Sequence, residues 1–347
     1  MQDGNSTAEI NTAALTARPA AMSLPIPGLV WAFRIHPDGS AEILPIDKPV
    51  DFNQGGLLWL HFNLADGRSL QWLAGAAFDA PPQALALLLS KDTFQQLHAT
   101  EDAVYGVICD LMRSIDETTE DTGYLRFFMT EQLLLSGRHQ ALSSVDATRR
   151  ALEDGHRIDS AASLLETIVE NVASTMERIA DRVAQSLDAI EEQVLAGDTS
   201  DQLLKLGPLR RTCVRLHRQL SGLRVIFHRL EQRNVKDIKP ALRLRAGKLA
   251  QRLDGLDHNV VEMRERSRLL QEELHLLIEE QGNNSLRVLS VLTALLMPPT
   301  LISGLFGMNT KGLPFADNDL GSLWAIVLML LSSFVAYLAM RRIGIIR

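Results

Sequence analysis

The chain has 347 residues, of which 46% are hydrophobic and 22% are charged, with a formal net charge of −7 and a mean hydropathy of +0.03. This acidic balance argues against a nucleic-acid-binding protein, which normally presents a basic face. The two cysteines, Cys109 and Cys213, are far apart in the sequence, so a disulfide framework is not expected. These averages resemble those of soluble domains and conceal two very different parts of the chain.

Residues 1–25 are rich in Ala, Ser, Thr and Asn without periodicity, which predicts a disordered tail and shows no signal peptide. An α/β domain is predicted over 26–155. An acidic run, DETTEDTG, is interpreted as a loop within it. The predicted helices are Ser69–Ala76 and Pro82–Leu89, and the predicted strands are Leu29–Ile35, Ala41–Leu44, Leu57–Phe62, Val104–Leu111, Tyr124–Thr130 and Gln132–Ser136.

Three histidines of this domain, His36, His61 and His98, are of the residue type that binds metals. No two of them have the close spacing of a recognisable zinc site, so a structural role is the preferred interpretation over ligation. The sequence contains no phosphate-binding glycine loop and no serine elbow. No catalytic constellation is found, and an enzyme is not predicted.

From 156 to 238 the chain changes to long amphipathic helices. Leu165–Val194 carries an apolar residue every three or four positions and a mainly acidic polar face. Leu209–Leu230 repeats the apolar spacing, but its polar face is basic. We predict an antiparallel helical hairpin over 156–238 whose oppositely charged flanks attract each other. An anionic partner for the basic helix is the alternative interpretation.

A stalk helix is predicted over 239–287, with Pro240 at its start. No stop signal separates it from the apolar run that follows, which predicts one continuous helix of about 65 residues and about 100 Å. A helix of this length needs neighbours, and its seam therefore predicts self-association. Steps of three and four define this coiled-coil seam: Leu242, Ala246, Leu249, Leu253, Leu256, Val260, Met263, Ser267, Leu270, Leu274 and Leu277.

Two charge-free apolar runs near the C-terminus, 288–309 and 320–340, are each long enough to cross about 30 Å of hydrocarbon as a helix. The connector over 310–319 is short, so the two spans should form an antiparallel hairpin. The tail over 341–347 carries three arginines, which places it in the cytoplasm by the positive-inside rule. Both termini are then expected in the cytoplasm, and the connector outside.

If several copies associate, one face of the first span lines their common axis. Polar groups inside a membrane usually face a partner or water, although Ser290 and Thr293 have the alternative of bonding their own helix carbonyls. Pro298 and Pro299 interrupt the backbone ladder and free carbonyls that need water or a neighbouring helix. The stripe alternates hydroxyls and amides with large apolar side chains: Asn283, Leu286, Leu289, Ser290, Thr293, Met297 and Thr300.

The first span closes with Gly307, Met308 and Asn309. A Gly-Met-Asn tripeptide at the mouth of the penultimate span, after a long stalk helix, resembles the CorA superfamily of divalent-cation transport proteins. The run MPPTLISGLFGMNTKGLP, which includes Gly312 and Pro314, is similar to the ZntB zinc-transporter branch of that superfamily. Lys311 departs from this branch, in which glycine is common at that position, and a ring of lysines there would repel cations.

The resemblance implies an α+β fold: a cytoplasmic α/β domain, a long-helix stalk and a two-helix transmembrane hairpin, assembled as a homopentameric funnel in the bacterial inner membrane. Asn309 would form a ring of amide oxygens at the pore entrance. Neutral oxygens at this point select a hydrated ion without stripping its water. The expected cargo is Zn²⁺, with Mg²⁺, Co²⁺, Ni²⁺ and Cd²⁺ as alternatives, and no resident cofactor is expected.

Proton coupling, which the zinc branch suggests, requires a titratable group near the cytoplasmic end of the span. His275, Glu279 and Glu280 are the candidates for this proton or metal role, and solvated stalk charge is the alternative. A CorA-type magnesium or cobalt channel is the alternative within the superfamily. A membrane-anchored coiled-coil scaffold or sensor is the alternative of another class, and it predicts a dry helix seam without ion flux.

Overall fold

The computed structural model describes residues 26–52, 54–76, 80–113, 118–199, 201–232, 238–308 and 321–344. These residues belong to two compact units. One comprises Met1–Ala189 and Leu206–Ser267, and the other comprises Ile190–Lys205 and Arg268–Arg347. The predicted tail over 1–25 and the predicted connector over 310–319 lie outside the described residues.

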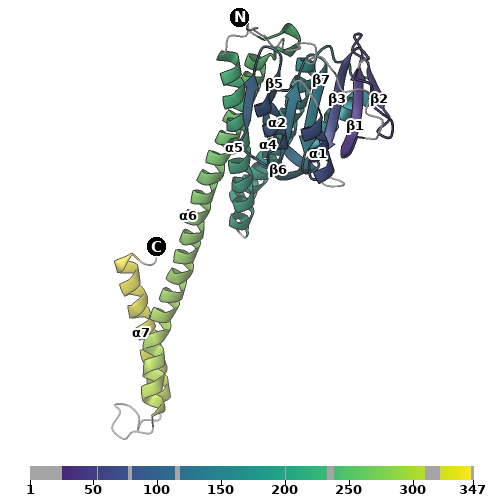
Figure 1. Cartoon of the computed structure of the whole chain (residues 1–347). Helices are drawn as coiled ribbons and strands as arrows, with labels where there is room; N and C mark the ends of the chain where they lie inside the picture. Colours follow the sequence, from purple (N-terminus) through teal and green to yellow (C-terminus); the bar gives the residue numbers. More distant parts are fainter. Residues whose placement is uncertain are drawn as a thin grey trace, which may run out of the picture. The chain divides into compact units, whose positions relative to one another are not determined.

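In the first unit, the described residues form a sheet of seven strands in the order β2-β1-β3-β7-β6-β5-β4 (Figure 1). Neighbouring strands are antiparallel except for the parallel pair β3 and β7. The inner strands are apolar along most of their length because helices cover both faces of the sheet. The strands are β1 Leu29–Ile35, β2 Ala41–Leu44, β3 Leu57–Asn63, β4 Gln96–Ala99, β5 Val104–Arg113, β6 Thr118–Met129 and β7 Leu133–Arg138.

The predicted strands are confirmed, but the interpretation of the acidic run as a loop is wrong. β6 begins at Thr118, inside that run, and pairs with β5 as far as Arg113. Two elements were not predicted. One is β4, a short edge strand of partly buried residues. The other is α3, Ser143–Glu153, whose buried face is largely made of serine, threonine and aspartate and therefore lacks an apolar period.

One face of the sheet packs against α1, Gly67–Gly75, and α2, Pro82–Leu89 (Figure 1). Asp66 begins α1 as its N-cap by accepting a hydrogen bond from the backbone N–H of Arg68. Pro82 begins α2, where the missing N–H of proline has no consequence. The core between these layers is apolar and includes Leu60, Phe62, Leu73, Leu88 and Phe128.

The other face of the sheet carries an aromatic cluster on β1 and β3. Phe33 stacks on Trp59 at 5.7 Å between ring centroids, and Trp31 stacks on His61 at 4.1 Å. His61 is fully buried and its Nδ1 lies 2.8 Å from the hydroxyl of Ser136. Burial lowers the pKa of His61 well below its usual value, so this histidine is a neutral core residue.

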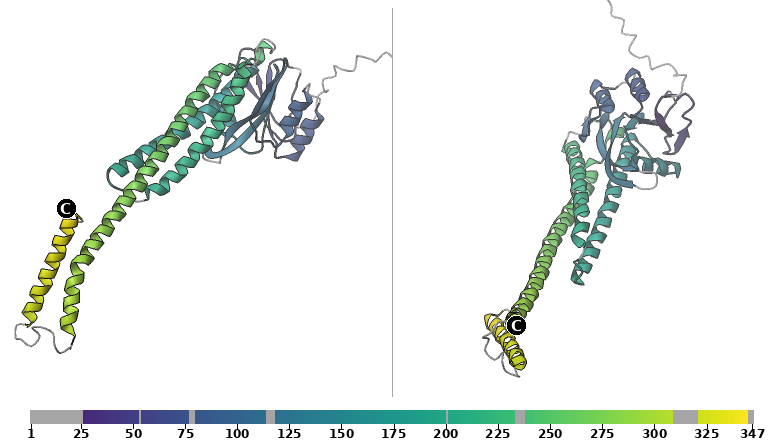
Figure 2. Two further views of the ribbon diagram at one scale, coloured as in Figure 1. Left: turned by 90° about the vertical axis from the view of Figure 1, so that its left-hand side faces the viewer. Right: turned by 90° about the horizontal axis from the view of Figure 1, so that it is seen from below.

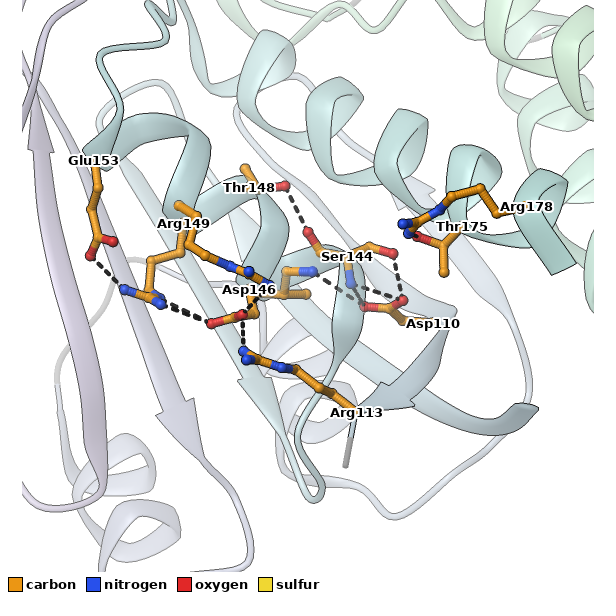
Figure 3. Close-up of polar contacts among 11 residues, drawn as sticks. Asp110, Arg113, Ser144, Asp146, Thr148, Arg149, Glu153, Thr175 and Arg178 are labelled. Atoms are coloured by element: carbon orange, nitrogen blue, oxygen red, sulfur yellow. Dashed lines mark hydrogen bonds and ion pairs between the residues drawn. The ribbon is translucent and has the colours of Figure 1, made fainter. Parts of the chain in front are cut away.

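Helix α3 lies on this face, and a residue from a neighbouring strand caps it (Figure 3). Its N-cap position, Leu142, provides no side-chain acceptor. The carboxylate of Asp110 on β5 instead accepts hydrogen bonds from the backbone N–H groups of Ser144, at 3.0 Å, and Val145, at 3.3 Å. Burial raises the pKa of Asp110 to about 6, although these hydrogen bonds oppose the increase.

Three long helices follow: α4 Ala161–Leu195, α5 Gln202–Gln232 and α6 Ala246–Gly307. Their segments in the first unit run side by side (Figure 2). Acidic side chains of α4 pair with basic side chains of α6 and of the residue just before it: Glu166 with Arg245, Glu170 with Lys248, Glu177 with Arg252 and Asp188 with Arg266. Basic side chains of α5 also pair with α6: His217 with Asp257, and Arg224 and His228 with Asp254.

The two helices of the predicted hairpin are present as α4 and α5, but charged side chains of both pair with α6, which the prediction did not include. The structure also changes the interpretation of the predicted coiled-coil seam, which lies on α6. Leu249, Leu253 and Val260 are buried within a single copy of the chain, so the seam does not by itself require self-association. α6 also begins later than predicted, because Pro240 starts a short 3₁₀ turn, Pro240–Leu242, and the α-helix begins at Ala246.

In the second unit, the C-terminal part of α6 lies antiparallel to α7, Gly321–Ile343 (Figures 1 and 2). Helix α6 continues through Pro298 and Pro299. Proline has no N–H, so Pro299 cannot donate to the carbonyl of Leu295 one turn earlier. The hydroxyl of Ser333 on α7 lies 3.3 Å from that carbonyl and donates to it. The neighbouring helix, one of the two predicted alternatives, therefore satisfies this freed carbonyl.

We predict that Ser333→Ala lowers the free energy of unfolding of the hairpin by about 1 kcal/mol, because the Leu295 carbonyl loses its donor in an apolar surrounding. The measurement is the thermal midpoint of the purified protein in detergent, followed by circular dichroism. Ser332→Ala is the matched control, since this hydroxyl bonds the Met329 carbonyl of its own helix at 2.8 Å. Equal midpoints for the two variants would contradict the assignment.

The pH dependence of the unfolding free energy provides a second test, through the ionisation of Asp110. Because its pKa is raised to about 6 from 3.8, the native state binds a proton more tightly than the unfolded state between about pH 4 and 6. Its stabilising contribution is therefore complete below about pH 4 and decreases as the pH rises to about 6. We expect the unfolding free energy of the wild type to fall relative to that of Asp110→Asn over this range, by up to about 3 kcal/mol. A rise of the wild-type value relative to the variant would show that the cap hydrogen bonds outweigh burial.

Candidate ion path along α6

Two helices of the described residues are long and apolar enough to cross a membrane, one within Pro240–Gly307 and the other Ser322–Ile343. They correspond to the two predicted spans. The beginning of the first span lies beside the end of the second. There the Arg287 guanidinium lies 3.4 Å from the Gly344 carbonyl, just beyond the last turn of α7. The basic residues of both helices are thus gathered at the same end of the hairpin, which is the end assigned to the cytoplasm by the sequence.

The side of α6 that faces α7 is apolar and partly buried. Besides Leu295, it includes Val291, Ala294, Pro298, Pro299, Ile302 and Phe306, which recur every three or four residues. The predicted stripe lies about half a turn around the helix from Leu295, since each residue advances about 100°. It therefore occupies the side of α6 opposite to α7.

The residues of the stripe are exposed in the single chain. Met297 is 70% exposed, Leu286 62% and Leu289 59%, and Asn283, Ser290, Thr293 and Thr300 are also in the exposed class. An open groove of about 730 Å³ runs along this side of α6, and the predicted residues Thr293, Met297, Thr300 and Met308 line it. The structure thus brings these predicted residues onto one uncovered face.

The threonine hydroxyls of the stripe bond their own helix. Thr293 donates to the Leu289 carbonyl at 2.8 Å, and Thr300 donates to the Leu296 carbonyl at 2.7 Å. The back-bonding alternative is therefore correct for Thr293, and Thr300 bonds its own helix in the same way. It does not exclude a role facing water, because a hydroxyl that donates its only hydrogen keeps its oxygen lone pairs. Such an oxygen presents acceptors alone, the groups that attract cations and hydrated cations.

The same side of α6 continues toward the cytoplasmic end. For a straight helix, His275 and Glu279 fall on the line of the stripe, whereas Glu280 is turned away from it. All three side chains are exposed. Within the described residues, no group of three or more His, Cys, Asp or Glu side chains is arranged to hold a metal ion. The proton or metal role of these three residues stays a prediction.

The tripeptide motif lies at the end of α6. Gly307 is the last residue of the helix, and Met308 is 53% exposed beyond it. Asn309, Lys311, Gly312 and Pro314 lie outside the described residues. Of the motif, the described residues Gly307 and Met308 lie at the mouth of the span.

Sequence reasoning missed two parts of this region. Gly304 and Leu301 also line the groove, and extending the same three-four stepping by one turn beyond Thr300 would have included Gly304. Ser333 was not recognised as the partner of the Leu295 carbonyl, because the sequence does not define the register between the two spans. Among the N-terminal histidines, His36 pairs with Glu42 at 3.3 Å and His98 stacks on Tyr105.

Comparison with known proteins covers most of the chain. Residues 54–342 match the model of a family described as CorA-like Mg²⁺ transporter protein. The "Zinc transport protein ZntB" of Klebsiella pneumoniae subsp. pneumoniae is 23% identical over 316 residues, which cover 90% of this chain and 95% of that protein. The protein of the same name from Pectobacterium carotovorum subsp. carotovorum is 23% identical over 315 residues, covering 89% and 94%.

Solved structures share the fold. The full-length CmaX protein superposes with a TM-score of 0.76 at 24% identity, covering 91% of this chain and 97% of that one. The CorA magnesium transporter from Methanocaldococcus jannaschii superposes with a TM-score of 0.66 at 20% identity, covering 91% and 98%. With the family match extending over both apolar helices, the chain belongs to the CorA-like Mg²⁺ transporter family of divalent-cation transporters.

Proposed function

We propose that this protein transports Zn²⁺ across the bacterial inner membrane as a homopentamer, along a path lined by the stripe of α6. The observation that carries the proposal is the placement of the stripe on the side of α6 opposite to α7. One copy of the hairpin leaves that side uncovered. Several copies arranged around an axis would enclose it, with α7 of each copy on the outside.

The chemistry of the stripe suits a hydrated divalent cation. The Thr293 and Thr300 oxygens keep their acceptor lone pairs, and the Asn283 side chain offers an amide oxygen. These neutral oxygens bind the water shell of an ion more weakly than carboxylates would, so that the ion is released again. Met297, Leu289 and Leu286 lie between the polar positions and form apolar constrictions, which can close a pore by excluding water.

The Gly307-Met308-Asn309 motif supplies the entrance of the proposed path. Five copies of Asn309 would place a ring of amide oxygens at the mouth, where the ion arrives with its water. Lys311 follows two residues later and would add positive charge near the same ring. We therefore expect Lys311 to slow cation entry, and Gly312 and Pro314 to shape the turn that leaves the span.

Zinc is the proposed ion because the curated relatives that align over about nine-tenths of the chain are named zinc transport proteins. Magnesium is the second candidate, since the description of the family model names Mg²⁺. Coupling to protons would use His275 or Glu279, which continue the line of the stripe toward the cytoplasm.

The test is metal entry into proteoliposomes that contain the purified protein and a trapped zinc-sensitive dye. We predict Zn²⁺ entry by the wild type and a loss of at least about tenfold in rate with Asn309→Ala, while the pentamer remains assembled. Ser332→Ala is the control, because its hydroxyl bonds its own helix within α7. Competition by Mg²⁺ and the response to an imposed proton gradient would identify the ion and the driving force.

Two results would count against the proposal. A pentameric wild-type protein that passes neither Zn²⁺ nor Mg²⁺ would favour the membrane-anchored scaffold. Normal entry through a correctly assembled Asn309→Ala variant would remove the entrance role of the motif.

A further inference from the structure

A pocket of about 630 Å³ lies in the N-terminal unit, far along the sequence from the spans. Its apolar wall comes from the β1–β2 hairpin and includes Phe33, Ile43 and Pro45. Its polar side is formed by Arg138 of β7 and by Asp146, Arg149 and Glu153 of α3, where Arg149 pairs with both carboxylates. This volume lies within the range of about 300 to 1,000 Å³ that is usual for sites of small organic molecules.

Arginines converge on Asp146 (Figure 3), a residue of the pocket wall. Arg113, Arg149 and Arg150 all pair with the single carboxylate of Asp146, and Arg149 also pairs with Glu153. Asp146 is only 7% exposed, so these pairs neutralise a nearly buried charge.

Arg138 differs from its neighbours. Its guanidinium lies over the ring of Trp31, 5.6 Å from the centroid, and forms no hydrogen bond or ion pair within the described residues. Burial lowers the pKa of Arg138, and the nearby guanidiniums of Arg113 and Arg149 act in the same direction, against the attraction of Asp146. A partly buried cation without a bonded anion is unfavourable, and an anionic ligand would remove this penalty.

A further donor beside Arg138 lacks an acceptor. The Nε1 atom of Trp31, which lines the pocket, is buried without a hydrogen-bond partner in the described part of the chain. The Trp31 indole and the Arg138 guanidinium therefore both have hydrogens to donate and no acceptor among the described residues.

We propose that this pocket binds an organic phosphate of nucleotide size, with the phosphate at Arg138 and the planar apolar part along the β1–β2 wall. Phosphate oxygens match the fork of a guanidinium and accept from several donors at once. The exposed carboxylate of Asp47 also lines the pocket, at the hairpin, and would face the end of the ligand away from the phosphate. This site is separate from the proposed ion path and does not depend on it.

The test is isothermal titration calorimetry of the full-length protein in detergent with EDTA present, using adenosine monophosphate as the probe. Inorganic phosphate and adenosine are titrated separately, since one supplies only the anionic part and the other only the apolar part. We expect adenosine monophosphate to bind more tightly than either. Arg138→Met should weaken its binding at least about tenfold, because the chain keeps its bulk at that position and loses the charge.

Arg150→Met is the matched control: it removes a guanidinium that pairs with the same Asp146 but does not line the pocket, and should change the affinity less than about twofold. Ile43→Glu is a second variant, at a side chain that is 56% exposed and therefore tolerant of substitution, and it should also abolish binding. The proposal is overturned if the wild type gives no binding heat up to about 5 mM, the limit set by a weak site. It is also overturned if both Arg138→Met and Ile43→Glu bind as the wild type does.

Discussion

The two opposite sides of α6 have different surroundings, and the rest of the architecture depends on this difference. One side is packed by the chain itself: by α4 and α5 in the first unit and by α7 in the second. The other side, from His275 to Met308, is left open by the described residues of a single copy. Because an isolated helix of this length would not be stable, the packed side keeps α6 formed while the open side remains available.

The start of α6 is held at a defined point by charge. Glu166 of α4 is 5% exposed and accepts hydrogen bonds from both the backbone N–H and the side chain of Arg245, the residue just before the helix. A carboxylate at a helix N-terminus is favourable because the first N–H groups have no partner within the helix. The exposed ion pairs farther along contribute about 0 to 1 kcal/mol each, so they define register more than stability.

Periodicity in the sequence was sufficient to predict most of the elements. The apolar runs of Leu29–Ile35 and Leu57–Phe62 identify strands, and the long uncharged runs identify the spans. The continuity of α6 through Pro298 and Pro299 was also predicted, since no stop signal precedes them. The stripe followed from stepping along one helix, which needs no knowledge of tertiary structure.

Features that depend on contacts between distant residues could not be predicted in this way. The cap of α3 is supplied by Asp110, more than thirty residues earlier in the chain, so no local signal marks the helix start. We predicted that the acidic face of α4 contacts α5, because the two helices are adjacent in sequence. In the structure, Glu177 and Asp188 on that face pair with α6. The pocket beside Arg138 could not be predicted for the same reason, because it is lined by residues of β1, β2, β7 and α3 that are distant in the sequence.

The central claim is that the side of α6 opposite to α7 faces water inside the membrane. Cysteine accessibility tests it most directly, since the native Cys109 and Cys213 are both buried. In membranes containing the protein, Thr293→Cys and Met297→Cys should react with a water-soluble thiol reagent at least about tenfold faster than Leu331→Cys on α7, because the reactive thiolate forms only in water. Equal, slow reaction at all three positions would mean a dry helix seam and would contradict the claim.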